Sequence, residues 1–214
     1  MLDSTTNGTS DGVHYNDRYA GAFWEETDGA FTFATATFNI PAQPAEQNYA
    51  VWVAIDGIQH NDSWFSAGIN AVVLDNTETT YQAWCYWGND VPYYFNVTIM
   101  PKDVIRASIT AHNATSGTAL IENLNNGQAN VQNLQVNSTL SLLEGEVSWG
   151  VMLYQVNDTI PFDTVTITNA TAYGPSGSIY KAEGANKLVI KQDNEVVTSV
   201  ETTGSTITIQ HVYE

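Results

Sequence analysis

Runs of alternating apolar and polar residues dominate this sequence, and their period of two is that of side chains along a β-strand. The clearest run covers residues 30–41 and gives each strand face one character: Ala34, Ala36, Phe38 and Ile40 against Thr35, Thr37 and Asn39. Pro41 closes the run, because proline cannot donate to a strand ladder. No window of about twelve residues shows a convincing helical period of 3.6. We therefore expect roughly a dozen strands and little helix.

The chain has 214 residues, which is within the range of one all-β domain. Turn residues recur along its second half, at 126–127, 157–158, 174–175, 193–194 and 203–204. We expect residues 18–214 to form a single antiparallel β-sandwich or jelly roll of two large curved sheets, similar to concanavalin. Residues 1–17 are polar and form a predicted N-terminal arm, which either completes an edge strand of its own domain or docks on a neighbouring subunit.

The charge balance is strongly acidic, with 6 Lys and Arg against 23 Asp and Glu and a net charge of −17. This argues against nucleic acid, because no basic surface could displace phosphate counterions, and against an anionic membrane surface. Charged residues make up only 14% of the chain. A sparse but acidic charge set suits an acidic medium, where carboxylates are protonated and little repulsion remains. A salt-adapted surface and a plain acidic extracellular protein stay open as alternatives.

Several features favour an extracellular or cell-surface location. Acceptor sequences for N-glycosylation occur at Asn7, Asn61, Asn96, Asn113, Asn137, Asn157 and Asn169. The first residues lack the basic start and apolar stretch of a signal peptide, so we interpret the chain as a mature form. No apolar run reaches the length of a membrane span, so no membrane insertion is expected. Cys85 is the only cysteine, which excludes an intramolecular disulfide and favours a buried, inert thiol.

The stretch Val51–Asn70 and the run Tyr81–Trp87 predict a cleft, since four of the six tryptophans fall in them: Trp52, Trp64, Trp84 and Trp87. In the first strand one face would carry Val51, Val53 and Ile55, and the other Trp52, Ala54 and Asp56. Trp84 and Trp87 are an odd number of residues apart, so at most one of them would face the groove. Tryptophans along a polar groove could stack on sugar rings or on peptide side chains.

Eight segments in this order and spacing resemble the glutamic peptidases, or eqolisins, from about residue 18 to 213. They read RYAGAFWE, FATATFNIP, NYAVWVAIDG, YQAWCYW, SGTALIENLNNGQ, SWGVMLY, PFDTVTITNATA and VVTSVETTGSTITIQHV. The resemblance implies a sandwich of two seven-stranded antiparallel sheets and an ancestry among acid endopeptidases. It also implies that Trp52, Asp56 and Trp84 match cleft residues of the family.

The same resemblance implies that both catalytic positions have changed. In the family a Gln orients a water and stabilises the oxyanion, and a Glu acts as general base. The Gln position falls on Ser66, in FSAG, and the Glu position falls on Ser148, in VSWG. Two further cleft positions are Asn70, where an acidic residue is expected, and Tyr86, where a Glu is expected. A serine without an adjacent base is neither a base nor an activated nucleophile, so no catalytic residue is predicted.

Three alternatives keep some chemistry in the cleft. Glu146 stands two residues before Ser148 on the same strand face and could act as a displaced base, with Gln59 in place of the missing Gln. A Ser66–His60–Asp56 triad and a calcium site from Asp56, Asp62 and Asn70 are weaker readings. The sequence has neither an HExxH motif nor an EF-hand loop, so no metal and no cofactor is expected.

The prediction from sequence is therefore a non-catalytic, glutamic-peptidase-like module with a binding or an extracellular structural role. Its partner would be a peptide, a glycan or a neighbouring subunit, and the N-terminal arm could build a homo-oligomer or filament. The first alternative is an acid-active endopeptidase with relocated residues. The second is a carbohydrate-binding module that uses Trp52 with Trp84 or Trp87.

Overall fold

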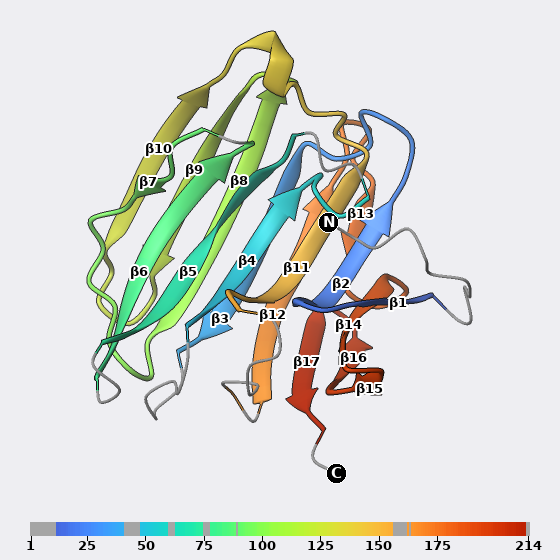
Figure 1. Cartoon of the computed structure of the whole chain (residues 1–214). Helices are drawn as coiled ribbons and strands as arrows, with labels where there is room; N and C mark the ends of the chain where they lie inside the picture. Colours follow the sequence, from blue (N-terminus) through green and yellow to red (C-terminus); the bar gives the residue numbers. More distant parts are fainter. Residues whose placement is uncertain are drawn as a thin grey trace.

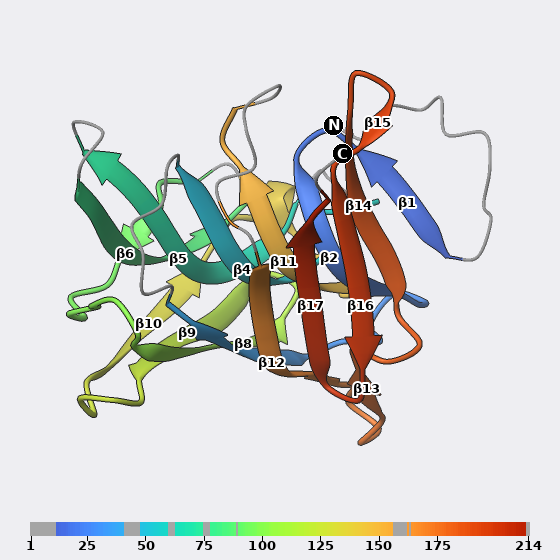
Figure 2. The same cartoon turned by 90° about the horizontal axis from the view of Figure 1, so that it is seen from below.

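The computed structural model describes residues 12–40, 48–59, 63–74, 78–88, 90–155, 162 and 164–212. They form two sheets packed face to face, as Figures 1 and 2 show. Among them, helical structure is confined to one 3₁₀ turn, Ser138–Leu140. No helix in this part of the chain is long and apolar enough to cross a membrane. The prediction of an all-β sandwich is confirmed.

The first sheet has nine strands and carries the predicted cleft. Eight of its strands follow the order β1-β14-β2-β11-β4-β5-β6-β7, and β15 pairs with β14. Their bounds are β1 Val13–Asn16, β2 Tyr19–Glu25, β4 Tyr49–Ile55, β5 Phe65–Leu74, β6 Glu78–Trp87, β7 Tyr93–Tyr94, β11 Glu146–Leu153, β14 Asn186–Gln192 and β15 Glu195–Val196. Neighbouring strands are antiparallel except β1 and β14, which are parallel.

The second sheet has eight strands and lies behind the first in Figure 1. Seven of them follow the order β10-β9-β8-β3-β12-β17-β16, and β13 pairs with β12. Their bounds are β3 Phe33–Asn39, β8 Val104–Asn113, β9 Ser116–Asn123, β10 Ala129–Gln135, β12 Thr164–Tyr173, β13 Ile179–Lys181, β16 Thr198–Thr203 and β17 Thr206–His211. All of their pairings are antiparallel.

The main core fills the space between the sheets, and the period of two decides which residues enter it. Strand β3 contributes its predicted apolar face, while its Thr and Asn residues lie on the other side. Strand β4 sends Val51, Val53 and Ile55 into the same core. Trp52 and Ala54 belong to a second, smaller apolar cluster with Phe23. Both face assignments made from the sequence are confirmed, and the first sheet therefore has an apolar patch on its outer face.

The end of the predicted N-terminal arm is a strand of the protein's own sheet. Residues Val13–Asn16 pair with Lys187–Ile190 of β14, so the boundary expected at residue 18 falls inside the fold. The ring of His14 stands edge-on to Phe23, with centroids 5.0 Å apart. Backbone pairing and this ring contact tie the segment down, although its polar composition is typical of a free tail. Residues 1–11 lie outside the described part.

Other sequence features can be placed in the same way. Four of the glycosylation acceptors are described, and all four are exposed: Asn96, Asn113, Asn137 and Asn169. Asn7, Asn61 and Asn157 lie outside the described residues. Cys85 is fully buried in the main core, and burial raises the pKa of its thiol to about 12. It therefore stays protonated and unreactive at ordinary pH, as the sequence predicted.

Candidate functional site

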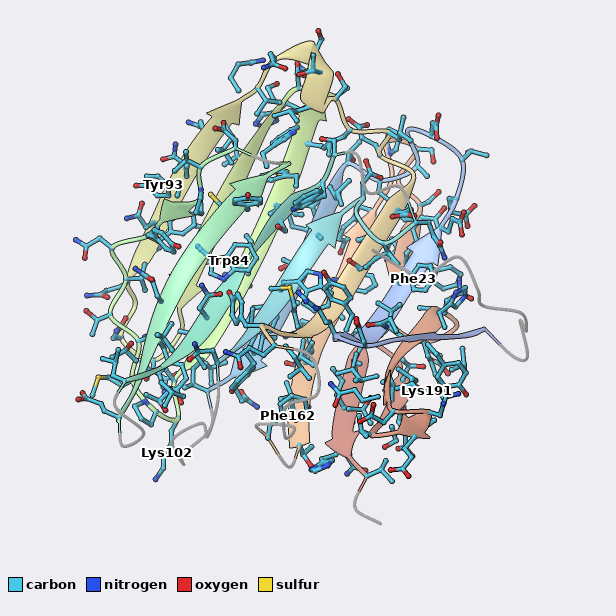
Figure 3. The ribbon with its side chains drawn as sticks, in the orientation of Figure 1. Phe23, Trp84, Tyr93, Lys102, Phe162 and Lys191 are labelled. Atoms are coloured by element: carbon cyan, nitrogen blue, oxygen red, sulfur yellow. The ribbon has the colours of Figure 1, made fainter. Side chains whose placement is uncertain are left out.

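A cleft of about 540 Å³ lies on the outer face of the nine-stranded sheet, over β4, β5, β6 and β11. Trp84 and Phe23 stand on this face, which is turned toward the viewer in Figure 3. Among the described residues, Asp56 is the only charged side chain in the lining, and none of the lining side chains is basic. Seven aromatic residues supply much of the wall: Tyr19, Trp52, Trp64, Trp84, Tyr86, Tyr94 and Tyr154.

Trp52 forms part of the floor because both neighbouring strands carry glycine beside it. Its register partners are Gly68 on β5 and Gly150 on β11. A Cβ atom added to Gly150 would lie 2.9 Å from Cη2 of the indole and 2.4 Å from the carbonyl oxygen of Ala20. The missing side chain lets the indole lie across the adjacent strand. Its Nε1 donates to Oγ of Ser148 at 3.2 Å.

Ser66 and Ser148 occupy matching places on either side of the central strand. Both are register partners of Ala54, so the three residues form one row across β5, β4 and β11. Two interstrand spacings separate the serine Cα atoms by about 10 Å. Both side chains line the cleft, although they are only 5% and 1% exposed. Serine side chains are too short to meet across that distance.

No group that could activate a serine lies beside this row in the part of the chain that the structure describes. Among the described residues, the cleft lining contains no histidine and no lysine. His14, His112 and His211 lie elsewhere, and His60 falls outside the described residues, as does Asp62. The triad and the calcium site considered from sequence each need one of these two residues, so both fall outside what the structure describes. Among the described side chains, no group of three His, Cys, Asp or Glu could hold a metal ion.

Asp56 closes one end of the cleft and organises the start of β11. The backbone of Asp56 is in the left-handed region (φ 59°), and the residue is only 2% exposed. The carboxylate accepts hydrogen bonds from four consecutive backbone amides at 2.8–3.0 Å, those of Leu143, Glu144, Gly145 and Glu146. Burial raises the pKa of Asp56 even though these four donors oppose the rise. Four backbone donors thus hold the Asp56 side chain in one position.

Glu146 makes the reciprocal hydrogen bonds, from the start of β11 back to the residues after β4. We call these two carboxylates and their backbone donors the Asp56–Glu146 corner. Glu146 is fully buried, and its carboxylate accepts from the backbone amides of Ile58 at 2.9 Å and Gln59 at 2.8 Å. The backbone amide of Asp56 donates to the carbonyl oxygen of Glu146 at 3.0 Å. Glu146 is absent from the described lining of the cleft, and so is Gln59, whose side chain is exposed. The two proposed replacement residues therefore lie beside the cleft rather than in it.

Glu144 gives this corner a pH dependence that can be measured. Burial, and next the negative charge of Asp56, raise the pKa of Glu144. A raised carboxyl pKa means that the folded state keeps its proton at a pH where the unfolded chain has lost it, so stability falls as pH rises through that window. We expect Glu144→Gln to unfold at a higher urea concentration at pH 7 and to gain less than wild type on acidification to about pH 4.

The matched control for this measurement is Glu201→Gln, which removes one charge from an exposed site on β16. Its urea midpoint should follow the pH dependence of the wild-type protein. If Glu144→Gln and Glu201→Gln behave alike at every pH, the attribution to the Asp56–Glu146 corner is wrong.

Aromatic pairs hold the walls of the cleft in place. Trp64 and Tyr86 are stacked, with centroids 5.9 Å apart and an interplanar angle of 26°. Tyr19 stands edge-on to Trp52 at 5.7 Å. The hydroxyl of Tyr154 donates to Oδ1 of Asn70 at 2.7 Å. Because Trp64 rests on Tyr86 and Trp52 on Tyr19, these parts of the wall present fixed aromatic faces.

Five of the six cleft residues expected from sequence do line the cleft: Trp52, Asp56, Asn70, Trp84 and Tyr86. Trp87 does not, because it is three residues from Trp84 and points between the sheets. There it is 1% exposed, stacks on Phe65 with centroids 4.6 Å apart, and donates from Nε1 to the carbonyl oxygen of Leu140. The expectation that at most one of Trp84 and Trp87 faces the groove is correct, and the assignment of Trp87 to the cleft was wrong.

Sequence reasoning missed several wall residues. Met152 and Tyr154 follow Ser148 at steps of two and line the same cleft, so the strand period alone could have found them. Tyr94 belongs to the two-residue strand β7 after an irregular segment, and no local signal marks it. In the described structure the indole Nε1 of Trp84 and the hydroxyl of Tyr81 are buried without a hydrogen-bond partner.

Comparison with known proteins decides the family. The model of the peptidase A4 family matches residues 17–211, which is nearly the whole chain. The chain belongs to the peptidase A4 family. This confirms the resemblance to glutamic peptidases and accounts for the order of its eight segments.

Relatives within the peptidase A4 family align over most of their length. Aspergillopepsin-2 of Aspergillus niger is 28% identical over 96% of this chain and 81% of its own. Scytalidopepsin B of Scytalidium lignicola is 27% identical over 85% of this chain and 74% of its own.

Solved structures of this family share the fold. Scytalido-glutamic peptidase, in complexes with a transition state analog inhibitor and with a peptide-based transition state analog, is 25% identical and superposes with TM-scores of 0.79 and 0.78. Both comparisons cover 92% of this chain and 99% of the other. Aspergilloglutamic peptidase from Aspergillus niger is 31% identical, with a TM-score of 0.69 over 78% of this chain and 100% of its own.

Proposed function

We propose that this protein is a non-catalytic member of the peptidase A4 family whose cleft binds an extended, uncharged peptide segment outside the cell. The observation that carries the proposal is the row Ser66–Ala54–Ser148. The family resemblance puts the catalytic Gln and Glu on these two serines, and the described cleft offers neither of them a base. A peptide bond in this cleft would be held but not hydrolysed.

The residues that line the cleft support an extended, uncharged peptide as the ligand. A related peptidase has been solved with a peptide-based analog, so this sheet architecture accommodates a peptide chain. In the present cleft, stacked rings such as Trp64 and Tyr86 favour proline or aromatic side chains, as aromatic grooves do in proteins that bind proline-rich segments. Within the described lining, a charged peptide would meet no basic partner and only the sequestered carboxylate of Asp56.

The displaced-base alternative has less support. Both carboxylate oxygens of Glu146 accept backbone hydrogen bonds, and the side chain is fully buried. For catalysis the carboxylate would have to leave these amides and turn toward the cleft. Such a move would leave two backbone donors without partners, which costs about 1–3 kcal/mol for each.

An extracellular or cell-surface location under acidic conditions remains part of the proposal. It is supported by the net charge of −17 and by the exposure of the four described glycosylation acceptors. The pairing of Val13–Asn16 within the sheet leaves less of the arm for contact with a neighbouring subunit.

The direct test is a fluorescence titration with a neutral proline-rich peptide, which the cleft tryptophans should report. We expect Tyr86→Ala to weaken binding about tenfold, because it removes one partner of the Trp64 stack. Tyr173→Ala removes an exposed tyrosine from β12, outside the described lining, and should bind as the wild type does.

A titration with soluble oligosaccharides runs beside the peptide titration. Saturable binding of a sugar, weakened by Tyr86→Ala, with no binding of the peptide, would favour the carbohydrate alternative. If Tyr86→Ala and Tyr173→Ala change the affinity for the peptide equally, the peptide binds outside this cleft.

A further inference from the structure

The eight-stranded sheet ends in an open edge at β10, which lies at the border of the molecule in Figure 1. Among the described strands, β10 pairs with β9 alone, so one of its two sides has no strand partner. β10 has seven residues, and the other terminal strands of the two sheets are shorter: β16 has six, β1 has four and β7 has two. It is therefore the longest template for pairing with another chain.

Natural edge strands usually carry a charge, a proline or a bulge that prevents such pairing. β10 reads ANVQNLQ and has none of these, and its register with β9 is unbroken. The whole run 123–143 contains no charged residue. β16, the edge at the opposite end of the sheet, carries the exposed Glu201. Of the two terminal strands of this sheet, β10 alone therefore lacks a charge.

The absence of net charge around β10 indicates that its partner is a second copy of this chain. Residues 104–135 contain one arginine and one glutamate, Arg106 and Glu122, and these pair at 2.6 and 2.7 Å. This end of the sheet is neutral in a chain with a net charge of −17. Two copies of the chain repel one another elsewhere, and here they can approach with least repulsion.

We propose that β10 is a self-association surface, at which two copies join their eight-stranded sheets through antiparallel β10–β10 pairing. A two-fold axis through Gln132 places Ala129 opposite Gln135, and Val131 opposite Asn133. Val131 is 53% exposed and Asn133 is also exposed. The carbonyl oxygen of Asn133 accepts from Nε2 of Gln132 at 2.9 Å, so this side-chain amide gives way when a partner strand pairs. The strand is then complementary to itself.

The expected dimer is weak and depends on solution conditions. One strand pair is smaller than a standard protein interface, which buries roughly 1,200–2,000 Å². Salt screens the repulsion between the two acidic bodies, so dimerisation increases with ionic strength and with protein concentration. This surface is separate from the cleft, and association through it does not depend on the proposed peptide binding.

Sedimentation velocity of the wild-type chain, over a range of protein concentrations at about 0.15 and 1 M NaCl, tests the proposal. The double variant Val131→Lys/Asn133→Lys places lysines directly opposite lysines in the proposed register, where like charges oppose pairing. The matched control is Ile179→Lys/Val196→Lys, which adds the same charge at two exposed sites on β13 and β15. Thermal melts confirm that each variant is folded.

We expect the fraction of wild-type dimer to increase with protein concentration and with salt. The β10 variant should lose the dimer, and the control variant should keep it. Mixing the lysine variant with Val131→Glu/Asn133→Glu should restore a dimer, because opposite charges then face one another. A wild-type chain that stays monomeric under all of these conditions overturns the proposal. The proposal is also overturned if the β10 lysine variant and the control lysine variant weaken the dimer equally, or if neither of them weakens it.

Discussion

The double variant Ser66→Gln/Ser148→Glu is expected to digest a denatured protein at roughly pH 2–4, under conditions where the wild-type chain does not. The two positions face one another across Ala54, with Cα atoms about 10 Å apart. Glutamine and glutamate side chains extend far enough to hold one water between them, and serines do not. Nε1 of Trp52, which now donates to Ser148, is placed to donate to the new carboxylate.

The expected rate is at least about 100-fold above that of the wild type, which is the lower range for a positioned general base. Ser66→Gln/Ser148→Gln is the control, since it fills the same volume without supplying a base. Release of acid-soluble peptides measures the rate. Wild-type digestion that Glu146→Gln abolishes would refute the non-catalytic proposal and establish the displaced base instead.

The substitution Asp56→Asn is expected to lower the free energy of unfolding by about 2–6 kcal/mol at pH 7, which is about 1–3 kcal/mol for each of two buried backbone donors left without an acceptor. The carboxylate accepts four backbone hydrogen bonds through two oxygens. An asparagine keeps one oxygen and points an NH₂ group at two of the same donors. Urea denaturation followed by tryptophan fluorescence measures the loss.

Glu201→Gln again serves as the charge-matched control, and we expect it to change the free energy of unfolding by less than about 0.5 kcal/mol. An Asp56→Asn variant as stable as this control would show that other groups can satisfy the four amides. In that case Asp56 would not be the residue that organises residues 143–146.

Much of the fold follows from local pattern. The alternation in residues 30–41 and in β4 identifies strands, and it also tells which face enters the core. The pattern fails where pairing partners are distant in sequence. Val13–Asn16 has the composition of a tail, and only β14, more than 170 residues later, makes it a strand.

The candidate site was predictable to a similar extent. Trp52 was found from the alternation along its strand, and Trp84 and Tyr86 were found from the resemblance to the glutamic peptidases. Trp87 was misassigned although the alternation argued against it. The roles of Asp56 and Glu146 could not be found from sequence, because each carboxylate accepts from amides about 90 residues away. A carboxylate that caps backbone and one that lines a cleft have the same local sequence.

The reciprocal hydrogen bonds of Asp56 and Glu146 have a consequence for the proposed binding of a peptide in the cleft. They join the end of β4 to the start of β11, the two strands that carry Trp52 and Ser148. The floor is therefore rigid before any ligand arrives, and little ordering of the protein remains to oppose association. A cavity of this kind recognises its ligand by fit rather than by adapting to it, so a ligand of the wrong shape is excluded at the outset.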